Sequence, residues 1–129
     1  MLESRTLEVK DFANLISVKV RSEKEERTVE GTLFGSYGER LVRINGYKIE
    51  AIPQGHMLIL YNIDKPGMIG KVGSFLGEHR INIAQMDVGR EFIGGKAVMV
   101  INIDNPVSES LLAELCKIEG IAWAAVVTL

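Results

Sequence analysis

The chain has 129 residues, of which 47% are hydrophobic and 25% are charged, and its formal net charge is −2. This composition is typical of a folded protein with an apolar core, and the charge gives no electrostatic argument for binding nucleic acid or an anionic membrane. No apolar run approaches the about 20 residues that a membrane-spanning helix needs. No apolar stretch typical of a signal peptide follows Met1. We therefore expect a cytoplasmic protein without a nucleic-acid or membrane partner.

Residues 1–53 have the pattern of a small β segment. No clear period runs through residues 1–12, but the apolar residues alternate at 16, 18 and 20, which predicts a half-buried strand. A charged turn at 22–26 and a returning strand at 27–34 follow, and then a glycine-containing loop at 35–38. The dipeptide Asn45-Gly46 predicts a tight hairpin between strands at 41–44 and 47–52. Because a small sheet with one apolar face seldom stands alone, we expect it to belong to a larger domain.

Residues 54–129 predict a second domain, which begins after the boundary at Pro53-Gln54-Gly55. Strands are predicted at 57–61, 81–88, 96–103 and 121–129. A first helix is predicted at 67–80, with Ile69 among its apolar residues. A second helix is predicted to start after Ser108 as N-cap and to end at Gly120 as C′ residue. The order βαββαβ predicts a ferredoxin-like α+β fold.

The only cysteine, Cys116, excludes an internal disulfide and suits a reducing compartment. It lies in the pattern of the second helix beside Leu112 and Leu115, so we expect a buried structural thiol.

A repeated pentapeptide gives the clearest functional signal. NIDKP at 62–66 recurs as NIDNP at 102–106, and each copy lies between a predicted strand and a predicted helix. In the first copy the chain turns at Lys65-Pro66, and Gly67 opens the helix and lets a ligand approach the backbone. The N–H groups of Gly67, Met68 and Ile69 would then suit a carboxylate, while Asp64 would suit an ammonium group. This combination complements a free α-amino acid.

Two alternatives remain open for this region. Asp64 is an equally good candidate for a cap of its own helix, which would leave no ligand site. The second copy carries Ser108-Glu109 at its helix start. There the side chains would occupy the helix N-terminus or repel a carboxylate ligand, so we place the site at the first copy.

Gly70, Gly73 and Gly77 form a stripe on the first helix, and each glycine costs roughly 1 kcal/mol of helix stability relative to alanine. The stripe indicates close approach either by another helix, from the same or a second subunit, or by the domain's own sheet.

The sequence lacks the common catalytic and cofactor motifs. It contains no G-x-G-x-x-G, no phosphate-binding G-x-x-x-x-G-K-[ST], no paired-cysteine or H-E-x-x-H metal spacing and no G-x-S-x-G. We therefore expect no cofactor, no metal and no catalytic residue in this chain. Arg40, Arg43 and Lys48 flank the Asn45-Gly46 hairpin and are candidates for an anion site, although charges on a small sheet are usually just solvated.

The stretch from Asn62 to Gly70, with the segment from Gly77 to Ala84, resembles an ACT domain, a small βαββαβ module that senses amino acids. The D-x-P-G turn and the I-N-I strand start are the most diagnostic parts. The upstream and downstream segments at 11–16, 31–35, 41–47, 88–91, 94–99 and 106–129 resemble the C-terminal regulatory region of long-form D-3-phosphoglycerate dehydrogenases. In that family this region comprises the end of an intervening, allosteric substrate-binding domain, here 1–53, followed by the ACT domain, here 54–129.

The resemblance implies a function and a set of site residues. L-serine, the end product of serine biosynthesis, would bind between paired ACT domains of a homodimer or higher oligomer and slow the dehydrogenase. Asn62, Asp64, Pro66, Gly67, Met68 and Ile69 would come from one subunit and Asn82 from the other. The NAD-binding and catalytic domains of that oxidoreductase would lie upstream, and Met1 would mark a cut within the intervening domain. Arg40 and Lys48 fall near basic positions that serve an anion site in some long forms.

Three other interpretations remain open. The same pair of domains occurs in the β part of iron–sulfur L-serine dehydratases, although G-T-L-F-G and R-L-V-R-I-N-G-Y favour the dehydrogenase. A purely structural module would form a dimer that is indifferent to amino acids. An independent enzyme is disfavoured because the catalytic groups are lacking.

Overall fold

The computed structural model describes residues 2–8, 15–21, 26–33 and 39–129, and the chain divides into two compact units, Met1–Pro53 and Gln54–Leu129. The predicted turn at 22–26 and loop at 35–38 lie almost wholly outside the described residues. Within the described part of the chain, neither helix has the length and apolar character that crossing a membrane requires.

The first unit is a five-stranded antiparallel sheet in the order β1-β2-β3-β4-β5. The prediction of a hairpin at Asn45-Gly46 is confirmed, because both residues have positive φ values, 48° and 85°. The first strand was not predicted, since it lacks an apolar alternation; its register comes from pairing with the second strand, as at Leu7 opposite Ile16. The strands are β1 (Leu2–Glu8), β2 (Leu15–Arg21), β3 (Glu26–Leu33), β4 (Glu39–Ile44) and β5 (Tyr47–Ala51).

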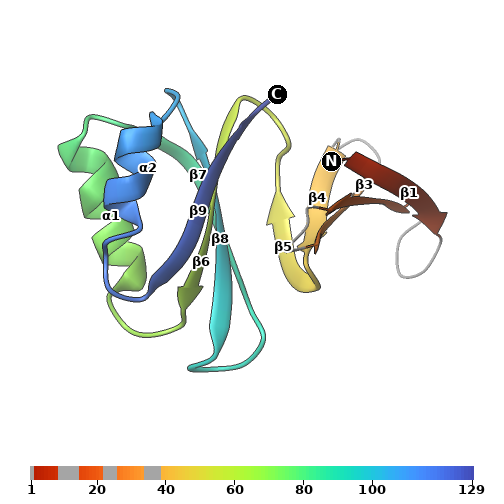
Figure 1. Ribbon diagram of the computed structural model, residues 1–129, viewed down its shortest axis with the longest axis horizontal. Helices are drawn as coiled ribbons and strands as arrows, with labels where there is room; N and C mark the ends of the chain where they lie inside the picture. Colours follow the sequence, from red (N-terminus) through yellow and green to blue (C-terminus); the bar gives the residue numbers. More distant parts are fainter. Residues whose placement is uncertain (1, 9–14, 22–25, 34–38) are drawn as a thin grey trace. The chain divides into compact units, whose positions relative to one another are not determined.

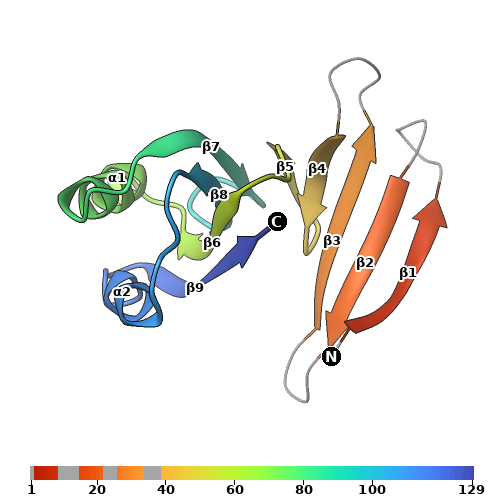
Figure 2. The same ribbon diagram turned by 90° about the horizontal axis from the view of Figure 1, so that it is seen from above.

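The second unit is a four-stranded antiparallel sheet in the order β7-β8-β6-β9, and both helices lie on one face of it (Figure 1). Figure 2 shows α1 on the side of β7 and α2 on the side of β9. The prediction of a ferredoxin-like α+β fold is confirmed. The elements are β6 (His56–Ile63), α1 (Met68–Glu78), β7 (Ile83–Arg90), β8 (Lys96–Ile103), α2 (Glu109–Leu115) and β9 (Ile121–Thr128).

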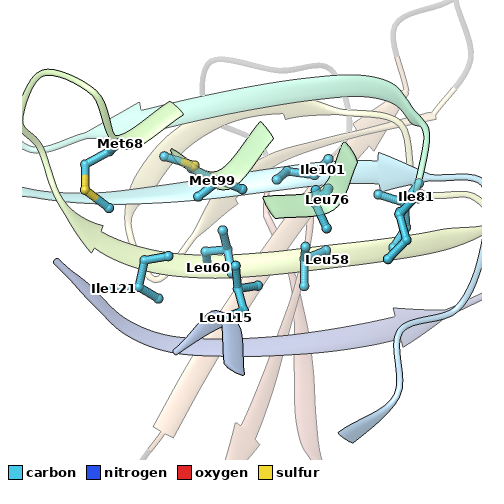
Figure 3. Close-up of a cluster of buried hydrophobic side chains, with 11 residues drawn as sticks. Leu58, Leu60, Met68, Leu76, Ile81, Met99, Ile101, Leu115 and Ile121 are labelled. Atoms are coloured by element: carbon cyan, nitrogen blue, oxygen red, sulfur yellow. The ribbon is translucent and has the colours of Figure 1, made fainter. Parts of the chain in front are cut away.

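The core of this unit lies between the sheet and the two helices (Figure 3). Alternate residues of the central strands, such as Leu58 and Leu60 of β6, point toward the helices and are fully buried. Leu76 of α1 and Leu115 of α2 meet them from the other side. The same alternation places Asn62, two residues after Leu60, on the helix-covered face. The core thus determines where the end of β6 presents its polar side chains.

Both helices differ from their predicted limits. The first helix begins at Met68, with Gly67 as a left-handed N-cap, and it buries Met68 in place of Ile69, whose side chain is 53% exposed. Periodicity alone does not reveal which of two adjacent apolar residues faces the sheet. The second helix ends at Leu115, so Gly120 is not its C′ residue but lies in the turn before β9, with a φ of 101°. The prediction that Cys116 is buried is wrong, because the helix ends before this exposed residue.

Ser108 provides a test of local stability in the second unit. Its hydroxyl oxygen accepts a hydrogen bond from the Leu111 N–H at 3.2 Å, which confirms the predicted N-cap. Ser108→Ala should therefore lower the free energy of unfolding by about 1 kcal/mol, measured by urea denaturation. Ser74→Ala, at an exposed position inside α1, should leave it unchanged or slightly higher. An equal loss in both variants would contradict the capping role.

Candidate functional site

The loop between β6 and α1 presents an open helix N-terminus. Among the described residues no side chain caps this helix, and the Asp64 carboxylate binds Arg90 and Gly94 instead, so the interpretation of Asp64 as a cap is wrong. The Met68 N–H approaches the Lys65 carbonyl oxygen only at 3.4 Å, and Lys71 donates the first short helical bond, to Gly67 at 2.9 Å. The first-turn N–H groups of a helix lack intrahelical partners and lie at the positive end of its dipole. Pro66 precedes the N-cap residue Gly67, so it lies in the loop before the helix and not at the first helical position.

Asp64 is held next to this N-terminus by a second loop. Its Oδ2 atom accepts a hydrogen bond from Arg90 Nη1 at 2.9 Å and another from the Gly94 N–H at 3.2 Å. The Asp64 N–H in turn donates to the Gly95 carbonyl at 2.7 Å. The bond from Arg90, followed by that from Gly94, holds the pKa of the Asp64 carboxyl below its usual value. Asp64 is therefore a carboxylate at neutral pH.

Asn62, near the end of β6, adds a buried acceptor just before this loop. Its side chain is only 4% exposed, and its Nδ2 atom donates to the Ile63 carbonyl at 2.9 Å. Its Oδ1 atom is buried and has no hydrogen-bond partner among the described residues. A buried carbonyl oxygen without a donor costs about 1–3 kcal/mol, so this atom favours a ligand with an N–H or O–H group.

Asn82 lies elsewhere in the unit. Its exposed side chain donates to Asp104 Oδ2 at 2.9 Å, in the second copy of the repeated pentapeptide. It follows the C-terminal end of α1, whereas Asp64 precedes the N-terminal end, and the 11-residue helix between them is about 16 Å long. One chain therefore brings Asn62, Asp64 and the helix start together but does not bring Asn82 to them.

Arg90 and Gly94 are contacts of the site that sequence reasoning missed. Both lie in or beside the β7–β8 connection, 26 and 30 residues after Asp64, and no local period relates them to it. Gly120 is a further supporting residue that was missed in this role, because its carbonyl accepts from the Ile63 N–H at 2.9 Å. A Cβ atom there would meet Met68 Sδ at 2.9 Å, and the φ of 101° favours glycine at this position.

The glycine stripe of α1 faces open space. A Cβ atom added at Gly70, Gly73 or Gly77 would have no neighbour within 4 Å among the described residues outside the helix itself. The interpretation that the domain's own sheet requires these glycines is therefore wrong. Beside them, Ile69 and Val88 are 53% and 40% exposed. Helix α1 and the adjacent strand β7 thus expose glycines together with two apolar side chains.

The basic residues of the first unit remain only a candidate anion site. Arg43 and Lys48 lie directly opposite each other on β4 and β5. However, Arg43 makes an ion pair with Glu30 at 3.4 Å, and Arg40 donates to the Glu39 carbonyl at 2.8 Å. The hairpin therefore brings two of the three cations together, with one of them already compensated by an acidic residue.

Comparison with known proteins agrees with this architecture. Residues 56–120 match the ACT domain family, and residues 1–45 match the D-3-phosphoglycerate dehydrogenase intervening domain. The chain is 38% identical to D-3-phosphoglycerate dehydrogenase of Bacillus subtilis over 92% of its length, and 36% identical to that of Methanocaldococcus jannaschii over 100%. A third relative, from Archaeoglobus fulgidus, is 38% identical over 98% of this chain. The chain spans only 22–24% of the length of these relatives.

Proposed function

Because this chain belongs to the ACT domain family and has the domain pair of the D-3-phosphoglycerate dehydrogenase regulatory region, we propose that it binds L-serine for feedback inhibition. The parent protein would be the NAD-dependent oxidoreductase of serine biosynthesis, a cytoplasmic enzyme with its catalytic residues outside this segment. The names of the relatives favour this parent over an iron–sulfur L-serine dehydratase.

The observation that carries the proposal is the pairing of an ionised carboxylate with an open helix start. The Asp64 carboxylate would receive the ligand's ammonium group, and the N–H groups at Gly67, Met68 and Ile69 would receive its carboxylate. The buried Oδ1 atom of Asn62 would accept a hydrogen bond from the ammonium group or the side-chain hydroxyl of serine. Each polar group of the ligand then has a partner of complementary charge.

A second copy of the chain would complete the site. Strand β7 is at an edge of its sheet, begins directly after Asn82 and ends at Arg90, which binds Asp64. In an antiparallel pairing of two β7 strands about a twofold axis, the start of one strand lies beside the end of the other. Asn82 of the second copy would then lie near Asp64 of the first. The exposed glycine stripe beside β7 supports pairing at this side.

Isothermal titration calorimetry with L-serine tests the proposal, with D-serine, glycine and L-alanine as controls. Saturable heat that is selective for L-serine would support it. A dimer that gives no heat with any of these amino acids would instead support a structural oligomerisation module.

Asn82→Ala should weaken L-serine binding by about 1–3 kcal/mol, because it removes a polar partner of a buried ligand group. The same calorimetric titration measures this loss. Asn105→Ala, which removes an exposed amide from the second copy of the pentapeptide, is the matched control and should bind like the unaltered chain. Equal affinities in all three proteins would place Asn82 outside the site.

A further inference from the structure

Arg90 places a full positive charge beside the carboxylate of the candidate site. Its Nη1 atom is 2.9 Å from Asp64 Oδ2, and the Gly94 N–H donates to that same oxygen at 3.2 Å. Among the described residues, Oδ1 of Asp64 takes part in no such bond, so it is the oxygen that remains for a ligand. Arg90 is therefore near enough to influence whatever binds Asp64 while leaving one oxygen accessible.

The charge of the site determines which ligands it can distinguish. An α-amino acid is a zwitterion without net charge, whereas the corresponding amine without the carboxylate carries one positive charge. A lone carboxylate would attract both through the ammonium group. The helix N-terminus supplies only about half a positive charge. With Arg90 the side-chain charges of the Asp64–Arg90 pair sum to zero, so a net cation gains nothing over a zwitterion.

We propose that Arg90 is a specificity-determining residue, whose guanidinium offsets the charge of Asp64 so that the site selects a zwitterionic α-amino acid over the corresponding amine. This inference rests on the proposed function, since it concerns how the same site chooses its ligand. It assigns Arg90 an electrostatic role that is separate from anchoring the β7–β8 connection.

A purely structural role for Arg90 predicts a different result. The side chain is 51% exposed, and the β7–β8 connection is held independently by the backbone bonds of Gly94 and Gly95 to Asp64. If Arg90 served only as an anchor, its loss would loosen the loop and weaken zwitterion and amine binding by the same factor. The ratio of the two dissociation constants would then stay unchanged, and that ratio separates the two roles.

The test compares L-serine with ethanolamine, its analogue without the carboxylate, on the full chain by calorimetric titration and displacement. We expect Arg90→Gln to lower the ratio of the ethanolamine to the L-serine dissociation constant by roughly tenfold. Arg90→Lys, which keeps the charge, should leave the ratio within about threefold of the original. Lys117→Gln removes the same charge from an exposed residue after α2 and should leave the ratio unchanged.

Each outcome bears on one proposal or the other. If the unaltered chain binds L-serine and Arg90→Gln leaves the ratio unchanged, the inference about Arg90 is overturned while the proposed function stands. If Arg90→Lys lowers the ratio as far as Arg90→Gln, the effect comes from hydrogen-bond geometry, and the charge argument is overturned. If the unaltered chain binds neither compound, the proposed function is wrong and this inference falls with it.

Discussion

Asp64→Ala should abolish L-serine binding at concentrations that saturate the unaltered chain, with a loss of affinity on the order of 100-fold. The substitution removes the carboxylate that Arg90 and Gly94 hold beside the start of α1, so the ammonium group of the ligand would lose its ionic partner. It also frees Arg90, whose charge would then repel the ammonium group. Calorimetric titration with L-serine measures the loss, and circular dichroism shows whether the fold is retained.

Glu109→Ala is the matched control for this variant. Glu109 is an exposed carboxylate in the first turn of α2, after the second copy of the pentapeptide, so its removal changes the net charge by the same amount. It should bind L-serine with the original affinity. If Asp64→Ala and Glu109→Ala both bind as the unaltered chain does, the site is not at the first copy of the repeat.

In the proposed pairing of two chains, Gly73→Glu should convert the dimer into monomers. The stripe of Gly70, Gly73 and Gly77 faces open space in one chain, and Gly73 lies at the middle of α1. A twofold axis near this point would bring the two new carboxylates close together in a surface without room for them. Like charges juxtaposed in an interface cost several kcal/mol, so the dimer dissociation constant should rise by on the order of 100-fold or more. Analytical ultracentrifugation measures this change.

Gly73→Ala tests whether replacing glycine alone, without the bulk and charge of glutamate, affects dimerisation. A Cβ atom at this position meets no described neighbour within 4 Å, and alanine favours the helix by up to about 1 kcal/mol relative to glycine. A methyl group adds far less bulk than glutamate and no charge, so the alanine variant should dimerise more strongly than Gly73→Glu and unfold at an equal or higher urea concentration. A Gly73→Glu chain that remains dimeric and binds L-serine normally would show that the pairing surface lies elsewhere.

The sequence predicted those parts of the fold that depend on local pattern. Alternating and continuous apolar runs gave the strands at 57–61 and 96–103, and Asn45-Gly46 gave the hairpin with positive φ at both residues. The first strand was not predicted, because its register is set by pairing with β2 and its own sequence has no apolar alternation. Cys116 was placed wrongly because the pattern of α2 continues past the point where the helix ends.

Only those residues of the candidate site that are close together in sequence could be predicted. The pentapeptide placed Asp64 beside the helix start, and a glycine before a helix suggested an open N-terminus. The contacts of Asp64 with Arg90 and Gly94 join residues that are distant in sequence, so they follow from the register of the β7–β8 hairpin in the folded sheet. The burial of Asn62 likewise depends on which face of β6 the two helices cover.

The separation of Asp64 and Asn82 at opposite ends of α1 leads to a complementation test. In the proposed pairing each site takes Asp64 from one chain and Asn82 from the other, so a dimer has two equivalent sites. An Asp64→Ala chain mixed with an Asn82→Ala chain would form a heterodimer in which one site carries both defects and the other carries neither. Two preparations that each bind poorly would then, after mixing and subunit exchange, regain one site of full affinity per heterodimer.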